Sequence, residues 1–296
     1  MLDVVVVGGG YVGLSVAVSI KQAAPHLGVE VIEAAPEEAW KKDPRASAII
    51  SAATKMLDVF GLWDRIEPDA QPINRMIVTD SKTSDPVRPV FLTFDGAVED
   101  GRPFAHMIPN VSMVAALRDA CAERGITIRH GLRATDFRDT GPSAELTLSD
   151  GSMLNARLVV ACDGVRSKLR DLAGIKTVTW QYGQSGIVTT VEHERPHEGV
   201  AEEHFLPAGP FAILPLKGNR SSLVWTERTA DADRLVASDD LVFEAELERR
   251  FGHKLGTIRA TPDRRAFPLG LTLARAFIAP RLALAGDAAH GIHPIS

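Results

Sequence analysis

The sequence has few of the residues that mark a disulfide-rich or a nucleic-acid-binding protein. It contains only two cysteines, Cys121 and Cys162, which are too few for a disulfide framework and favour a reducing compartment. Its 33 basic residues are scattered and are outnumbered by 38 acidic residues, so the formal net charge is −5. A nucleic-acid-binding protein needs a concentrated positive surface, and we therefore expect a cytoplasmic protein that does not bind nucleic acid.

Long apolar runs are also scarce. Residues 4–20 form an uncharged stretch of 17 residues, close to the lower limit for a transmembrane helix. Asp3 precedes this stretch and three consecutive glycines interrupt it, so we expect a strand, a turn and a helix rather than a membrane span or a signal peptide. With 45% hydrophobic and 24% charged residues, the 296-residue chain is typical of a globular protein of about two domains, or of one domain with an inserted lobe.

A glycine-rich motif between a strand and a helix indicates a dinucleotide site. Four segments follow one another: a β-branched run at 3–7, the spacing G-x-G-x-x-G at 8–13, a helical pattern at 14–24 and a strand at 29–33. Gly8 permits the tight turn, Gly10 lets a pyrophosphate approach the backbone, and Gly13 lets the helix pack closely on the strand. The helix N-terminus attracts the pyrophosphate, and Glu33 is placed to bind the ribose hydroxyls. This motif alone fits both FAD and a nicotinamide dinucleotide.

Two later motifs repeat the pattern of a buried strand followed by an acid. The apolar run 158–162 leads into D-G-x-x-S-x-x-R at 163–170, and the run 282–285 leads into G-D-A-A-H at 286–290. Asp163 and Asp287 are thereby expected at the carboxyl ends of strands, where ligands of open α/β sheets bind. Taken singly, each motif is equally typical of an ordinary turn, because Asp-Gly and Gly-Asp are common turn dipeptides.

Taken together in this order, the three motifs resemble the class A flavoprotein monooxygenases, the superfamily of para-hydroxybenzoate hydroxylase. Within it, the tail G-D-A-A-H-G-I-H-P-I is most similar to the ubiquinone-biosynthesis hydroxylases. Further similarity to that subgroup lies in D-P-R-A-S-A at 43–48, F-G-L-W at 60–63, G-P-F-A-I-L-P-L at 209–216 and S-L-V-W at 222–225. The resemblance therefore spans nearly the whole chain.

The resemblance implies FAD as the cofactor and NAD(P)H as the reductant. It places Glu33 at the ADP half of FAD, Arg45 at the flavin side, Asp287 at the ribityl chain and Pro294 near the isoalloxazine ring. The motif at 163–170 is associated in the family with both FAD and the nicotinamide. The implied cofactor-binding residues are Gly8, Gly10, Tyr11, Val12, Gly13, Glu33, Arg45, Asp163, Arg170, Gly286, Asp287 and Pro294.

The sequence departs from the family in two places. Relatives often place a polar side chain that touches the cofactor after an Ile-Pro-Asn turn, and here the apolar Met113 stands at about that position. Relatives also continue after His-Pro-Ile with a glycine-rich segment that begins a helix, whereas this sequence stops at Ser296. The resemblance therefore implies a homologue that is C-terminally truncated relative to the family.

The function implied is that of an FAD-dependent monooxygenase that uses NAD(P)H and O2 to hydroxylate an aromatic ring, with a polyprenylated phenol of ubiquinone biosynthesis as substrate. Because the flavin carries the chemistry, no catalytic residue is assigned. One alternative is a catalytically impaired homologue that acts as an assembly or binding subunit, and another is a flavoprotein reductase of prenyl substrates. A prenylated substrate implies peripheral contact with the inner membrane face or association with a biosynthetic complex.

Two other kinds of site lack support. No G-x-S-x-G motif occurs, so nothing indicates a hydrolase. His290 and His293 have the spacing H-x-x-H, but two ligands without a further cluster make an incomplete metal site, and we expect no metal.

The fold class expected is α/β, a Rossmann-like FAD-binding domain with an inserted antiparallel β-rich substrate lobe. Alternating apolar and polar residues between 176 and 268 indicate strands, 241–251 has helical spacing, and the strand-like runs 76–79 and 90–94 are expected to join the same lobe. We expect the FAD-binding domain to be discontinuous, with residues 1–75, 105–175 and 269–296. The substrate lobe then comprises residues 76–104 and 176–268.

Overall fold

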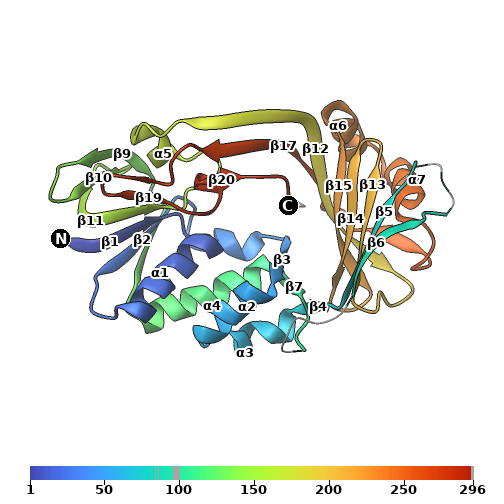
Figure 1. The fold of residues 1–296 in the computed structure, drawn as a ribbon, viewed down its shortest axis with the longest axis horizontal. Helices are drawn as coiled ribbons and strands as arrows, with labels where there is room; N and C mark the ends of the chain where they lie inside the picture. The colour runs from blue at the N-terminus through green and yellow to red at the C-terminus, as the bar shows by residue number, and fades with distance from the viewer. Residues whose placement is uncertain (84, 86, 96–100, 295–296) are drawn as a thin grey trace.

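The computed structural model describes residues 1–83, 85, 87–95 and 101–294. Figure 1 shows an α/β part that holds the N-terminus and a large sheet at the other end, joined by long strands. The α/β class expected from the sequence is confirmed. Residues 96–100 of the predicted substrate lobe, and Ile295 and Ser296 of the tail, lie outside the described residues.

The sheet of the α/β part has the strand order β18-β19-β11-β1-β2-β8, and β10 and β9 extend it from β11. The strands are β1 (Leu2–Val7), β2 (Val29–Glu33), β8 (Thr127–His130), β9 (Ala134–Asp139), β10 (Ala144–Leu148), β11 (Met153–Ala161), β18 (Ile278–Ala279) and β19 (Leu282–Leu284). β1 pairs in parallel with β11 and β2, and β11 pairs in parallel with β19. Because these strands run in one direction, the three motifs that follow β1, β11 and β19 meet at one edge of the sheet.

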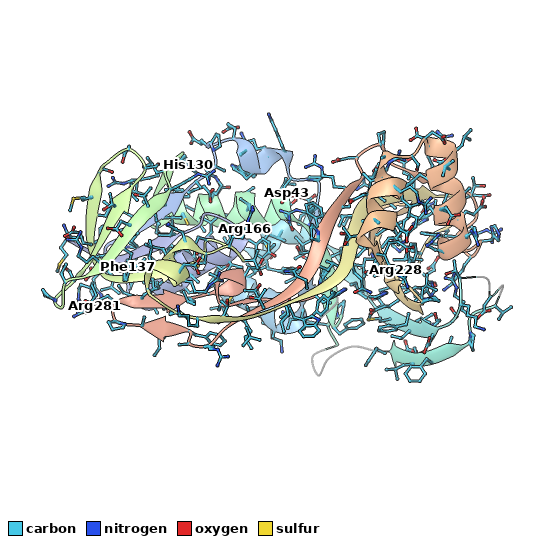
Figure 2. All side chains as sticks on the ribbon, turned by 90° about the horizontal axis from the view of Figure 1, so that it is seen from above. Asp43, His130, Phe137, Arg166, Arg228 and Arg281 are labelled. Carbon is cyan, nitrogen blue, oxygen red and sulfur yellow. The ribbon has the colours of Figure 1, made fainter. Side chains whose placement is uncertain are left out.

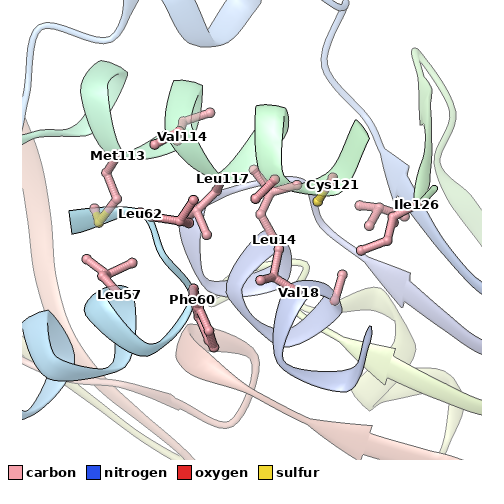
Figure 3. Packing of buried hydrophobic residues seen from close by; sticks show 14 of the residues in the cluster. Leu14, Val18, Leu57, Phe60, Leu62, Met113, Val114, Leu117, Cys121 and Ile126 are labelled. Carbon is pink, nitrogen blue, oxygen red and sulfur yellow. The ribbon is translucent and has the colours of Figure 1, made fainter. Parts of the chain in front are cut away.

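The helices of the α/β part pack on this sheet and form an apolar core with it. They are α1 (Tyr11–Ala23), α2 (Ser51–Val59), α3 (Trp63–Ile66) and α4 (Asn110–Glu123), while α5 (Lys168–Leu172) follows β11. Figure 3 shows Leu14 and Val18 of α1 packed against Leu117 and Cys121 of α4, and all four are buried. Within the described residues, no helix is long and apolar enough to cross a bilayer.

The large sheet has the order β20-β17-β12-β15-β14-β13-β5-β6, with β16 beside β12. Its strands are β5 (Arg75–Asp80), β6 (Val90–Asp95), β12 (Thr177–His193), β13 (Val200–Leu206), β14 (Gly209–Leu216), β15 (Arg220–Arg228), β16 (Ile258–Ala260), β17 (Arg265–Ala274) and β20 (His290–Gly291). β5 and β6, which cover the runs expected to be strands at 76–79 and 90–94, pair within this sheet, and β5 runs parallel to β13.

One face of the large sheet is covered by α6 (Thr229–Ala237) and α7 (Asp240–Phe251). Phe211 and Trp225 of the sheet and Phe243 of α7 are fully buried in that layer. The opposite face meets a small sheet of β3 (Ala46–Ile50), β7 (Ala105–Pro109) and β4 (Gln71–Ile73), in the order β3-β7-β4. Met107 of the small sheet packs with Ala201 of the large sheet. This second face of the large sheet therefore looks toward the α/β part.

Candidate functional site

A cavity of about 800 Å³ joins the α/β part to the large sheet. In Figure 2, His130 lies on the α/β side and Asp43 lies nearer the large sheet, and both line the cavity. Its walls include the glycine loop after β1, residues after β2, the loops after β11 and β19, and parts of β12, β15 and β17. The cavity is therefore elongated and touches all three motifs that the sequence analysis singled out.

The first glycine loop is packed too tightly for larger side chains at two positions. Gly8 has a φ of +115°, and a Cβ atom there would overlap the carbonyl oxygen of Cys162 in the next motif. A Cβ atom on Gly13 would overlap the carbonyl oxygen of Gly8. Gly10 differs, because a Cβ atom on it would meet no atom within 4 Å. Gly8 and Gly13 thus hold the loop together, while Gly10 borders the open cavity.

The N-terminus of α1 opens into this cavity. Gly10 is its N-cap and provides no side-chain cap, and the first turn holds no acid. Tyr11, Val12 and Gly13 line the cavity from this end. Backbone N–H groups at an uncapped helix N-terminus attract anions, so this end of the cavity suits a pyrophosphate.

Glu33 lies at the end of β2 and lines the same cavity. Its carboxylate accepts a hydrogen bond from the backbone N–H of Gly9 and another from that of Ala35, the latter at 2.6 Å. An ionised carboxylate oxygen can accept more than one hydrogen bond, so both oxygens retain capacity for ligand hydroxyls. The backbone bonds fix the carboxylate in place before a ligand arrives.

Replacing Glu33 with glutamine tests this arrangement. The amide NH2 group cannot accept from a backbone N–H, so E33Q loses one anchoring bond and one acceptor for a hydroxyl. We expect the dissociation constant for FAD to rise about tenfold, the effect of one lost hydrogen bond to a charged group. Quenching of flavin fluorescence during titration measures it, and an unchanged constant would place the ribose elsewhere.

Three further residues near Glu33 were missed by the sequence analysis. Trp40 Nε1 and His130 Nδ1 are buried and have no hydrogen-bond partner among the described residues, although both side chains line the cavity. The Arg118 guanidinium stacks 5.5 Å from the Trp40 ring centre and lies 3.2 Å from His130 Nε2. Buried polar atoms without partners are uncommon, so these groups fit a polar ligand such as the adenosine half of a dinucleotide.

Nearer the large sheet, the cavity contains a fixed pair of charges. The Arg45 guanidinium donates two hydrogen bonds of 2.8 Å to the Asp43 carboxylate, which also accepts from Asn110 Nδ2 at 3.1 Å. Burial opposes ionisation of Asp43, but these hydrogen bonds outweigh burial and hold its pKa below the usual value. The Asp43 partner raises the pKa of Arg45, and the negative charge of Asp287 acts in the same direction. Arg45 and Asp287, both predicted cofactor residues, both line the cavity.

Asp163 and Arg170 lie behind the cavity wall rather than in it. Cys162 and Gly164 line the cavity, whereas the Asp163 carboxylate accepts from the backbone N–H groups of Lys168 and Leu169 at 2.9 and 3.3 Å. Arg170 is buried and donates to the carbonyl oxygens of Val165 at 3.0 Å and Ala288 at 3.1 Å. Arg170 thus ties the motif after β11 to the motif after β19.

Of the remaining predicted cofactor residues, Gly286 contacts the first motif, whereas Pro294 lies away from the cavity. Gly286 has a φ of +60°, and a Cβ atom on it would press against the Val12 side chain at 3.0 Å, so the first and third motifs are in contact. Pro294 is exposed and does not line the cavity.

Met113 stands at about the position where the resemblance implies a polar contact with the cofactor. Its side chain is buried in the core with Leu57 (Figure 3). Asn110, Val114 and Arg118 line the cavity instead. These three recur every four residues and so share one face of α4, a pattern that was visible in the sequence.

The described residues contain no group of three or more His, Cys, Asp or Glu side chains placed to hold a metal ion. They do form a cavity with an anion-attracting helix end, a fixed acid beside it and a charged pair nearer the large sheet. These features fit an extended dinucleotide better than a compact ligand.

Comparison with known proteins gives the same picture. Residues 1–296 match a family model described as an FAD binding domain. The ubiquinone hydroxylase UbiL of Rhodospirillum rubrum is 44% identical to this chain, over 99% of this chain and 68% of that protein. The 3-demethoxyubiquinol 3-hydroxylase of Escherichia coli is 33% identical, over 99% of this chain and 74% of its own length.

Solved structures show the same fold. The p-nitrophenol 4-monooxygenase of Pseudomonas putida superposes with a TM-score of 0.78 at 22% identity, over 100% of this chain and 74% of that one. Aklavinone-11 hydroxylase, solved as a ternary complex with FAD and aklavinone, superposes with a TM-score of 0.75 at 20% identity, over 98% of this chain and 57% of that one.

Proposed function

The chain belongs to the FAD-binding domain family and is an FAD-dependent monooxygenase, and we propose that it uses NAD(P)H and O2 to hydroxylate the aromatic ring of a polyprenylated phenol in ubiquinone biosynthesis. Family membership confirms the resemblance drawn from the three motifs. The proposed substrate class follows from two relatives, a ubiquinone hydroxylase and a 3-demethoxyubiquinol 3-hydroxylase. The observation that carries the proposal is the single cavity that extends from Glu33 to the large sheet, because it offers room for a cofactor and a ring beside it.

The residues of this chain are assigned as follows. The uncapped N-terminus of α1 binds the pyrophosphate, and Glu33 binds the ribose hydroxyls. Asp287 binds the ribityl chain, and Arg45, held by Asp43, lies at the flavin. Asp163 and Arg170 shape the loops that border the cofactor. A bound FAD would supply the redox chemistry, namely acceptance of hydride from the nicotinamide and activation of O2 for hydroxylation of the ring.

We assign the substrate to the large-sheet side of the cavity. Val188, Ser222 and Phe267 line it there together with Thr190, Thr261, Asp263 and Arg265, so this wall combines apolar side chains with hydroxyl and charged groups. Such a wall can bury an apolar ring while its polar groups orient the hydroxyl group of a phenol. On this assignment residues 1–75, 105–175 and 269–296 bind the cofactor, and residues 76–104 and 176–268 bind the substrate.

A prenyl chain partitions into a bilayer, so the substrate is met at a membrane surface or delivered by other proteins. We therefore place the protein at the inner membrane face, in peripheral contact or within a biosynthetic assembly.

The test measures NADH and NADPH oxidation by the FAD-loaded protein with 2-farnesylphenol, and with farnesylbenzene as the matched control without the hydroxyl. We expect the phenol to accelerate oxidation and to yield a product with an added hydroxyl, while the control does neither. A reduced prenyl chain without added oxygen would support the reductase alternative. No response of the FAD-loaded protein to the phenol would contradict the proposed substrate class.

A further inference from the structure

The inner face of the large sheet, which looks toward the α/β part, carries a carboxyl group that has no role in the proposed cofactor site. Glu203 lies in β13 and is 6% exposed. Its oxygen Oε1 is buried without a partner, and no hydrogen bond or ion pair to the Glu203 carboxyl occurs anywhere in the described chain. A buried polar group without a partner costs about 1–3 kcal/mol of stability, so a role for it is expected elsewhere than in folding.

The strand register shows which way Glu203 faces. Glu203 pairs with Ala212 of β14, Ala212 pairs with Val224 of β15, and Val224 pairs with Val188 of β12. Residues paired across neighbouring strands project from the same face of a sheet. Val188 lines the cavity, so this whole row lies on the cavity face.

Glu202, the residue before Glu203 on β13, faces the other side of the sheet. Glu202 contacts Lys254 and lies 3.5 Å from His204 Nε2, and His204 stacks on Phe211 in the layer under α7. Successive side chains of a strand alternate between faces, so Glu202 and Glu203 point to opposite sides of the sheet.

Contacts of the small sheet relate the position of Glu203 to that of Arg45. Ala201 precedes Glu203 by two residues, so it lies on the same face about 7 Å away. Ala201 belongs to the apolar cluster on which Ala46 of β3 packs. Ala46 also lines the cavity and directly follows Arg45. Glu203 itself does not line the cavity, but its carboxyl lies on the sheet face that the cavity-lining segment of Arg45 and Ala46 approaches.

We propose that Glu203 is a substrate-recognition residue that exchanges hydrogen bonds with the hydroxyl group of the phenol. This inference rests on the proposed function and names the group of this chain that distinguishes a phenol from an apolar ring. Burial raises the pKa of Glu203, which favours the neutral acid. A neutral carboxyl has one O–H donor and a carbonyl acceptor, so it can give one hydrogen bond to a phenol hydroxyl and accept another from it.

A second polar group on the same face supports a polar end to the substrate site. Thr226 Oγ1 is buried without a partner in the described structure. Thr226 pairs with Gly186, and Gly186 pairs with Phe267, which lines the cavity. The inner face thus holds two unsatisfied polar groups, Glu203 and Thr226, among apolar neighbours, which is the usual composition of a site that orients a small ligand.

The experiment compares E203Q and E203L with the matched control E202Q, which alters the neighbouring glutamate on the other face. The FAD-loaded proteins are titrated with 2-farnesylphenol and with its methyl ether, and binding is followed through the flavin absorbance. We expect E203L to raise the dissociation constant for the phenol about tenfold, as one lost hydrogen bond does, and to leave that for the ether unchanged. E203Q and E202Q should stay within about threefold of the original protein, because the amide of E203Q still donates and accepts.

Thermal unfolding separates recognition from a structural role. E203L removes an unsatisfied buried carboxyl and replaces it with an apolar side chain, so its Tm should rise by about 2 °C or more. A lower Tm together with equal weakening of both ligands would show that Glu203 only supports the fold and would overturn the inference. An unchanged affinity of E203L for the phenol would also overturn it, while leaving the proposed function intact. If the original protein bound neither ligand, the proposed function would fail, and this inference with it.

Discussion

The G13A variant is expected to unfold more easily and to lose FAD binding, whereas G10A is expected to fold normally and to bind FAD poorly. A Cβ atom on Gly13 would overlap the Gly8 carbonyl oxygen, so α1 must move away from β1 to admit it. Backbone displacement in a packed site costs about 3 kcal/mol, and urea unfolding of the FAD-free protein measures this loss. The displaced helix N-terminus then no longer faces the pyrophosphate, so binding falls below detection.

The matched G10A variant separates packing from cofactor contact. Its Cβ atom meets no protein atom within 4 Å, and Gly10 has a φ of −73°, which any residue adopts. We expect its free energy of unfolding to change by less than about 0.5 kcal/mol, as for other substitutions that disturb no packing. The dissociation constant for FAD should rise about tenfold or more, because the methyl group keeps the pyrophosphate from the backbone. Equal effects of the two variants on folding and on binding would contradict this division of roles.

The R170M variant is expected to lose stability even before FAD is added. Arg170 is 5% exposed and donates to the carbonyl oxygens of Val165 and Ala288, which connects the motif after β11 to the motif after β19. Methionine fills a similar volume but leaves both carbonyl groups without these donors. Hydrogen bonds from a charged group are worth about 1.5–3 kcal/mol each, so we expect a loss of about 3 kcal/mol in urea unfolding.

The control for this prediction is R166M, which removes an exposed arginine from the loop that precedes α5 (Figure 2). Its free energy of unfolding should change by less than about 0.5 kcal/mol. Asp287 directly precedes Ala288, so R170M should also weaken FAD binding through a displaced Asp287. If R170M weakened FAD binding while the FAD-free protein kept its full stability, Arg170 would act as a direct cofactor ligand and the positioning role would be wrong.

The arrangement of the first motif follows from local geometry, and the assignment of its residues to the cofactor stays a prediction. Gly8, Gly13 and Glu33 belong to one strand-turn-helix-strand unit, so their spacing along the chain determines their arrangement in space. The strands at 76–79 and 90–94 could be predicted from the sequence for the same reason, because the alternation of side chains is a local pattern. Their partner was not visible, because the parallel pairing of β5 with β13 joins segments more than a hundred residues apart.

The parts that the sequence did not reveal depend on contacts that only the folded chain makes. The motif assigned Asp163 and Arg170 to the cofactor, and in the structure their hydrogen bonds run to Lys168 and Ala288, outside the lining of the cavity; their contact with FAD stays a prediction. The sequence did not indicate Arg118 as a site residue, because an arginine on a helix is usually a surface residue. Only the folded chain brings it over the Trp40 ring and against the cavity.

The origin of the oxygen atom in the product tests the central claim most directly. The FAD-loaded protein is supplied with NAD(P)H and 2-farnesylphenol under 18O2, and separately in H2 18O under ordinary O2, and the product is analysed by mass spectrometry. A monooxygenase transfers one atom of O2 to the ring, so the product should carry one 18O atom in the first experiment and none in the second. A product labelled only from water, or one that has gained no oxygen, would contradict the account.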